Sequence, residues 1–208
     1  MKNTKKGFTL LELLIVIAIL AVLGAITIFL LNPAETLKKA RDSQRISDLS
    51  TIKTALGIYL TSISSPQLDG IIGTKNNLCI GGAGTITAWS SFPVTATTTP
   101  TSDYSPTFTA VSNTSVASSS LVDGAGWIPV NLNNLTGGSP ISNMPIDPIN
   151  DNTELIYRYA CRKSPLGFEA DSALESTAFT VDDDKRIKDG GNNSNRFEAG
   201  TDLKILKL

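Results

Sequence analysis

The 208-residue sequence contains no histidine, and it has only two cysteines. Without histidine the chain lacks the commonest general base, the commonest neutral metal ligand and every Ser-His or Cys-His catalytic pair. The two cysteines stand in neither a CxxC nor a zinc-ligand arrangement. We therefore expect a protein that is not an enzyme, although carboxylates, lysine and tyrosine are still present to act.

A strong excess of charge is also missing. Lysine and arginine number 18 against 19 aspartate and glutamate residues, which gives a formal net charge of −1. The basic residues form no long stripe, so bulk electrostatics gives no case for nucleic-acid or anionic-membrane binding. The length suits one globular domain of roughly 100–150 residues and one additional element.

Charge is absent from one long stretch of the chain. Residues 1–7 are polar, whereas residues 8–31 are almost wholly apolar and carry no charge from Leu13 to Leu31. These nineteen residues rise about 28 Å as an α-helix, which is close to the hydrocarbon thickness of a bilayer. A soluble core helix rarely needs apolar residues all round. The segment is therefore predicted to span a membrane.

Residues 32–65 follow a different pattern. Apolar side chains recur between mostly polar positions at helical spacings, which predicts an amphipathic helix that continues the first. Pro33 interrupts the join and also restricts Asn32, so a kink or a locally unstable turn is expected there. The predicted apolar face consists of Leu37, Ala40, Ile46, Leu49, Ile52, Leu56 and Tyr59.

Residues 66–208 are interpreted as an extracytoplasmic globular domain with a Ser/Thr-rich loop at residues 81–125. β-branched and aromatic residues favour short strands separated by turns, in a spacing typical of an antiparallel sheet. The predicted fold class is α+β, with the long amino-terminal helix packed against this small sheet. The candidate strands are Thr85–Trp89, Glu154–Cys161, Phe168–Leu174 and Asp202–Leu206.

Glu12 is the anomaly of the apolar segment, because no lysine or arginine lies in the same turn. A carboxylate inside a membrane-spanning helix costs at least about 2.5 kcal/mol without a partner. Cleavage after Gly7 would give Phe8 a positive α-amino group. In a filament of staggered parallel helices, Glu12 could meet this amine on a neighbouring subunit and set the register of the helices.

The segment KKGFTLLEL, at residues 5–13, resembles the class III leader of type IV prepilins and type II secretion pseudopilins. The resemblance implies a leader at residues 1–7, cleavage between Gly7 and Phe8, N-methylation of Phe8, and an assembly role for Glu12. It also implies a single-pass precursor in the inner (cytoplasmic) membrane, which then joins a pilus or an envelope-spanning filament. The implied partners are identical subunits, a prepilin peptidase, an assembly platform with its ATPase, and membrane lipid before assembly.

Three alternatives stay open beside a pilus subunit. A secretion pseudopilin shares the same assembly chemistry, and MPIDPIND at residues 144–151, before a Tyr-x-Tyr segment, is similar to a turn of major pseudopilins. The Trp-Gly that usually follows that turn is missing here. A signal peptide or plain anchor fits less well, because the apolar run exceeds the usual length and Glu12 stays unexplained. A membrane-tethered enzyme or receptor is the third alternative, but no nucleophile–base constellation in the sequence supports an enzyme.

Two further sites are expected in the exported domain. Cys79 and Cys161 form an even pair, which suits one disulfide, while two buried free thiols are the alternative. Major pseudopilins bind calcium in a carboxyl-terminal loop, and the oxygen-rich residues Asp189, Asn192 and Asn193 are the candidates that this resemblance suggests. Their spacing is not that of an EF-hand, and an ordinary solvated turn is the alternative. No other cofactor is expected.

Overall fold

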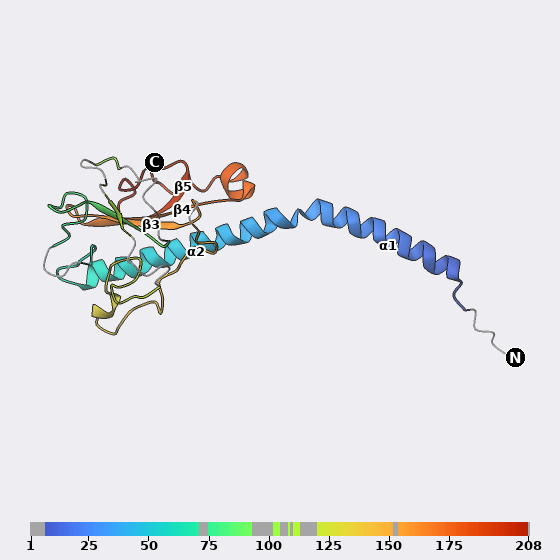
Figure 1. Ribbon diagram of the computed structural model, residues 1–208, viewed down its shortest axis with the longest axis horizontal. Coiled ribbons are helices and arrows are strands. Elements are labelled where there is room, and N and C mark those ends of the chain that lie inside the picture. Colours follow the sequence, from blue (N-terminus) through green and yellow to red (C-terminus); the bar gives the residue numbers. More distant parts are fainter. Residues whose placement is uncertain are drawn as a thin grey trace. The chain divides into compact units, whose positions relative to one another are not determined.

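The computed structural model describes residues 7–70, 75–92, 102–104, 108, 110–112, 120–151 and 154–207. The chain divides into two compact units, Met1–Lys38 and Lys39–Leu208. We call the second unit the head. Figure 1 traces the chain through α1 and α2 and shows the strands of the head. Much of the Ser/Thr-rich loop predicted at residues 81–125 lies outside the described residues.

Helix α1 spans Leu10–Leu31 and contains the long apolar run. Its one hydroxyl beyond the first turn is satisfied within the helix, since Thr27 Oγ1 donates to the Leu23 carbonyl at 2.8 Å. The stretch Leu10–Ile28 is long and apolar enough to cross a membrane, and none of it is buried in the chain. Such a helix requires an apolar environment outside the chain.

Helix α2 spans Pro33–Ser62. Between the two helices, Asn32 adopts a left-handed conformation with φ 38°. Pro33 has no N–H to continue the hydrogen-bond ladder, so it opens a new helix rather than extending the first. The predicted interruption at Asn32 and Pro33 is therefore confirmed.

The predicted apolar face of α2 is confirmed only in its later turns, where Leu49, Ile52, Leu56 and Tyr59 are buried. In the earlier turns the prediction is wrong, because Leu37 is 62% exposed and two charged residues are buried in place of apolar ones. The buried charged residues of α2 are Asp42 and Arg45.

The head contains a five-stranded sheet in the order β2-β1-β3-β4-β5. Four strands, β1, β3, β4 and β5, pair antiparallel, whereas β2 pairs parallel with β1 at the edge. The long helix supplies an apolar face to this small sheet, so the fold is α+β as predicted. The strands are β1 Thr87–Ser90, β2 Ala110–Ser112, β3 Tyr157–Arg162, β4 Gly167–Ala173 and β5 Arg196–Gly200.

Both faces of the sheet are covered by apolar side chains. Tyr157, Tyr159 and Cys161 of β3 share one face of the sheet and join the apolar residues of α2 in one core. Ala160 points to the other face and belongs to a second cluster. The second cluster consists of Ile80, Ile86, Ala88, Phe108, Ala160, Ile205 and Leu206, with Tyr104 packed against it.

The strand predicted at Asp202–Leu206 is wrong, because those residues form turns and the last strand is β5. In β5, Glu198 lies opposite Asp171 of β4. Charged residues thus alternate with apolar ones along β5. Its few apolar residues are not enough to identify it as a strand from the sequence. Ile205 and Leu206, which suggested the strand, are buried instead as part of the second cluster.

Candidate assembly site and the contacts of the head

The candidate assembly site lies where α1 begins. Thr9 is the N-cap of α1, and its hydroxyl accepts a hydrogen bond from the Glu12 N–H at 3.2 Å. In return, Glu12 Oε2 accepts from the Thr9 N–H at 2.9 Å and from the Thr9 hydroxyl at 2.8 Å. This reciprocal capping box satisfies two donors that a helix start otherwise leaves without partners.

Glu12 therefore has hydrogen-bond partners within its own chain, which the sequence reasoning missed. The signal was present, because Thr-x-x-Glu before an apolar run is the pattern of a capping box. The box directs the carboxylate back towards the start of α1, where the helix dipole also favours a negative charge. The carboxylate thus contacts the backbone N–H of Thr9, one residue from Phe8.

Gly7 and Phe8 precede the capping box and lie outside the helix, with both residues exposed. A Cβ added at Gly7 would meet no atom within 4 Å. The fold of this chain therefore does not require glycine at this position. The structure brings the three predicted residues Gly7, Phe8 and Glu12 to one end of α1, and their roles in processing and assembly stay predictions.

A second group of charged residues, which sequence reasoning missed, joins α2 to other parts of the head. Arg45 is completely buried, and its guanidinium donates to both carboxylate oxygens of Asp147, at 2.7 and 3.0 Å. Arg45 Nη1 also donates to Asp42 at 2.8 Å and to Glu175 at 2.5 Å. Arg41 forms a second two-bond contact with Glu175, at 2.9 and 2.8 Å. We call these five residues the charge cluster.

Each charged residue of the cluster binds at least one residue of opposite charge, which is what makes its burial tolerable. Hydrogen bonds from Arg41 and Arg45 lower the pKa of Glu175 to about 2. Burial opposes the charge of Arg45, but its hydrogen bonds to Asp147 and Glu175 raise its pKa above the ordinary value. Asp42 also accepts the Glu175 N–H at 3.0 Å. The cluster therefore attaches α2 to the segment after β4 and to the turn at Asp147.

Asp147 belongs to the Pro-x-Asp-Pro segment noted in the sequence. Besides binding Arg45, its Oδ1 accepts the Ile149 N–H at 2.9 Å, which closes the turn. The available sequence signal was on α2, where Arg41, Asp42 and Arg45 occur at helical spacing within the predicted amphipathic helix. That spacing alone could not name Asp147 or Glu175 as partners.

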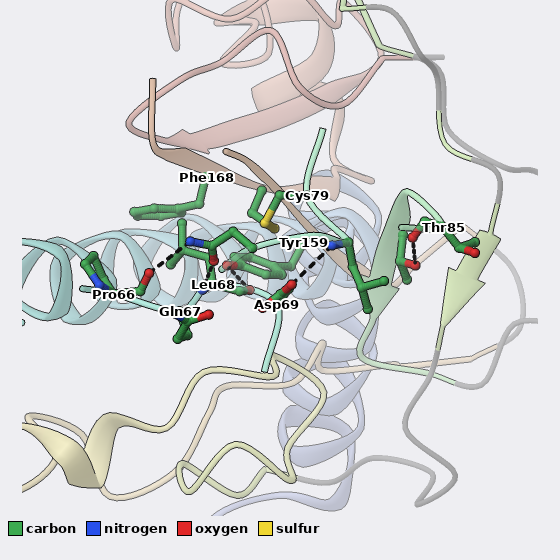
Figure 2. The surroundings of a disulfide bond; sticks show 12 residues. Pro66, Gln67, Leu68, Asp69, Cys79, Thr85, Tyr159 and Phe168 are labelled. Carbon is green, nitrogen blue, oxygen red and sulfur yellow. Dashed lines mark hydrogen bonds between the residues drawn. A yellow bond between two sulfur atoms is a disulfide. The ribbon is translucent and has the colours of Figure 1, made fainter. Parts of the chain in front are cut away.

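Cys79 and Cys161, the pair expected from the sequence, are joined by a disulfide with their Cα atoms 4.8 Å apart. Figure 2 shows that the bond lies beside the Pro66–Asp69 segment and Tyr159. The Tyr159 hydroxyl donates to the Leu68 carbonyl at 3.0 Å, and Asp69 accepts the Leu78 N–H at 3.1 Å. The chain that follows α2 is thus attached to β3 both covalently and by hydrogen bonds.

The predicted calcium residues are engaged with the protein itself. Asp189 accepts the N–H groups of Gly191 and Glu198, at 2.8 and 2.7 Å, with one carboxylate oxygen each. Asn193 Oδ1 accepts the Asn195 N–H at 3.0 Å, and Asn192 Nδ2 donates to Asp103 at 2.6 Å. No group of three His, Cys, Asp or Glu residues suited to a metal ion occurs in the described residues. Calcium binding stays a prediction.

Two buried glutamates occupy the face of the sheet opposite α2. Glu169 Oε2 accepts the Ile205 N–H at 2.7 Å, and Glu198 Oε2 accepts the Asn193 N–H at 2.9 Å. The Oε1 atoms of both are buried and have no donor among the described residues. Burial and the neighbouring Glu198 carboxylate raise the pKa of Glu169 to about 11, and we expect the pair to hold a shared proton at neutral pH.

Comparison with known proteins agrees with the features at the start of α1. The family described as the prokaryotic N-terminal methylation motif matches residues 2–28. The type IV major fimbrial protein FimA of Dichelobacter nodosus is 32% identical over 84 residues, which cover 40% of this chain and 52% of that protein. The chain thus matches about half the length of this relative. No solved structure matches it significantly.

Proposed function

We propose that this chain, which carries the amino-terminal segment of the type IV pilin and pseudopilin family, is a structural subunit of a type IV pilus-like filament. One observation carries the proposal. A single carboxylate, Glu12, is held at the start of an exposed apolar helix, five residues after an accessible glycine. That arrangement suits a helix whose leader is removed by cleavage and which then packs among identical helices.

In the proposed pathway α1 first anchors the precursor in the inner (cytoplasmic) membrane as a single span. A prepilin peptidase cleaves between Gly7 and Phe8 and methylates the new amine. Support comes from the exposure of both residues and from their position outside the helix, where a peptide bond is open to an enzyme.

Assembly would then exchange lipid for protein around α1. The Phe8 amine of one subunit is positive near neutral pH, and the Glu12 carboxylate of another is its complement. An ion pair between them in a low-dielectric core would leave neither charge unpaired and would fix the axial register of the helices. An assembly platform and its ATPase supply the work of extraction, and no catalytic role is assigned to the subunit.

The decisive test is mass spectrometry of the amino terminus of filaments sheared from cells. We expect a mature chain that begins at N-methylated Phe8. Gly7→Val should block processing, because a branched side chain would crowd the peptidase site. Since a Cβ at Gly7 meets nothing within 4 Å, the variant should fold normally. A mature chain that begins at Met1, or near Thr27, would overturn the proposal.

A pseudopilin of a type II secretion system is the alternative function. The observation in its favour is the Pro-x-Asp-Pro turn, whose Asp147 binds Arg45 of α2. The same contact would serve a pilus subunit equally well. Long surface fibres favour the pilus, whereas short envelope-spanning fibres and loss of exported proteins on deletion favour the pseudopilin.

A further inference from the structure

The segment Ala178–Lys188 carries the most exposed large apolar side chains described in the head. Val181 is 72% exposed and Ile187 is 64% exposed, against 49% for Leu121. We call this segment the apolar tip. It consists of a single π-helical turn, Ala178–Asp182, and the loop that follows it.

Hydrogen bonds within the apolar tip fix the conformation of its loop. The Lys185 N–H donates to the Phe179 carbonyl at 2.9 Å, and Arg186 Nη2 donates to the Thr180 carbonyl at 2.9 Å. Arg186 also pairs with Asp184 at 2.8 Å. The loop therefore keeps its apolar side chains at the surface, although their exposure to water is unfavourable.

Lysines lie beside the apolar tip, which is at one end of the head. Lys39, the first residue of the head, and Lys185 both lie over the Phe179 ring, each 5.8 Å from its centre. Lys188 follows in the same loop and is largely exposed. In Figure 1 the tip is the orange coil that protrudes from the head above α2.

Chain length limits the distance between this end of the head and a membrane that holds α1. Lys39 lies eight positions after Leu31, the last residue of α1, and eight positions rise about 12 Å as a helix. The headgroup layer extends about 5–8 Å beyond the hydrocarbon core. Lys39 and the tip beside it are thus within a short reach of the headgroups.

We propose that the apolar tip rests on the phospholipid surface of the membrane while the subunit is anchored there. Val181 and Ile187 would enter the interfacial layer, and Lys39, Lys185 and Lys188 would approach the lipid phosphates. This is the arrangement of interfacial segments, in which long basic side chains flank an inserted apolar residue. The inference rests on the membrane anchoring proposed above.

The charges of the apolar tip also indicate which lipid headgroups it can contact. Its three aspartates, at 182–184, balance Lys185, Arg186 and Lys188, so anionic lipid is not required and zwitterionic headgroups suffice. A contact with a second copy is less favoured, because the centres of protein interfaces are depleted in lysine and aspartate.

Tryptophan quenching by brominated lipid tests the proposal. Full-length Val181→Trp and Ile187→Trp are each placed, one chain per nanodisc, in phosphatidylcholine with or without brominated acyl chains. The native Trp89 and Trp127 are 3% and 2% exposed, so their emission is the internal reference and reports the fold. Leu121→Trp, at another exposed apolar position of the head, is the matched control.

We expect the added emission to be lost in brominated discs for Val181→Trp and Ile187→Trp and kept for Leu121→Trp. Equal emission from Val181→Trp in both lipids, with the chain incorporated in the disc, overturns the inference and leaves the proposed function intact. Quenching of the control to the same extent also overturns it. Failure of the chain to enter discs at all removes the membrane anchor, and with it both proposals.

Discussion

Glu12 is the only charged side chain among residues 8–31, and its surroundings within one chain do not require a charge. The capping box needs only acceptor oxygen atoms, which a glutamine also provides. A carboxylate is needed only if a cation meets it elsewhere. Comparing the two side chains therefore separates the local role from the proposed intermolecular one.

We predict that Glu12→Leu and Glu12→Gln are both inserted and cleaved but yield few or no sheared fibres. Loss of one member of a buried pair leaves the other charge unpaired, at a cost of about 3–5 kcal/mol per contact. Membrane and sheared fractions from strains that express only the variant provide the measurement. Normal fibre yield from Glu12→Gln would show that the cap matters and the charge does not.

The Glu169–Glu198 pair predicts an unusual pH dependence. The folded-state pKa of Glu169, about 11, lies above its ordinary value of 4.5. The stabilisation from its protonated form is therefore complete below pH 4.5 and is lost as the pH rises towards 11. The slope can reach about 1.4 kcal/mol per pH unit.

We predict that Glu169→Gln loses less stability than the natural chain between about pH 6 and about pH 9, because its amide donates to Glu198 at every pH. Urea unfolding of the detergent-solubilised chain at both pH values is the measurement. Glu175→Gln is the control, since arginines hold the pKa of Glu175 at about 2 and its loss should weaken the fold equally at both. Identical slopes for Glu169→Gln and the natural chain would refute the shared proton.

At the scale of elements, the head depends on how α2 is attached. The later turns of α2 pack through apolar side chains, and its earlier turns are attached through the charge cluster. Two contacts of Arg45 reach residues more than a hundred positions away, Asp147 and Glu175. Removal of one carboxylate would leave the buried guanidinium partly unpaired.

Asp147→Asn should therefore destabilise the head, but by less than the about 3–5 kcal/mol of a fully unpaired buried charge, because Asp42 and Glu175 still bind Arg45. Asp183→Asn, which breaks an exposed contact with Lys185 and Lys188, should leave the stability nearly unchanged. Thermal unfolding followed by near-ultraviolet circular dichroism compares the two variants. Equal effects from the buried and the exposed carboxylate would contradict the importance assigned to the cluster.

At the scale of the whole molecule, the disulfide closes a long covalent loop in the head. It joins residues 82 positions apart and encloses the Ser/Thr-rich connection. In the chain-entropy model such a closure contributes on the order of 4.5 kcal/mol by restricting the unfolded state. The bond therefore keeps the chain that follows α2 attached to β3 at Cys161.

We predict that thiol labelling of the denatured, unreduced protein modifies neither Cys79 nor Cys161, and that Cys79→Ser with Cys161→Ser lowers the unfolding midpoint. The double variant avoids a free thiol that could pair between chains. Full labelling of both cysteines before reduction would show that the bond does not form in the cell.

The sequence by itself determined the features that depend on local pattern. An apolar run without charge predicts α1 because a bilayer-length helix needs no partner chosen from elsewhere in the protein. β-branched and aromatic residues predicted a strand at Glu154–Cys161, and Pro33 predicted the break at Asn32. The segment at residues 5–13 indicated a resemblance to type IV prepilins and pseudopilins for the same reason. The residues that carry this resemblance lie in the first turn of α1 and directly before it.

Only the tertiary structure decided which distant groups meet. Arg45 occupies a position on α2 where the pattern favours an apolar residue, and its burial is tolerable only because Asp147 and Glu175 arrive from other elements. Ile205 and Leu206 look like a strand, but the second face of the sheet needs a cover and β5 takes the edge position. Periodicity describes an element's own surface, whereas the partner of a buried charge depends on how the whole chain packs.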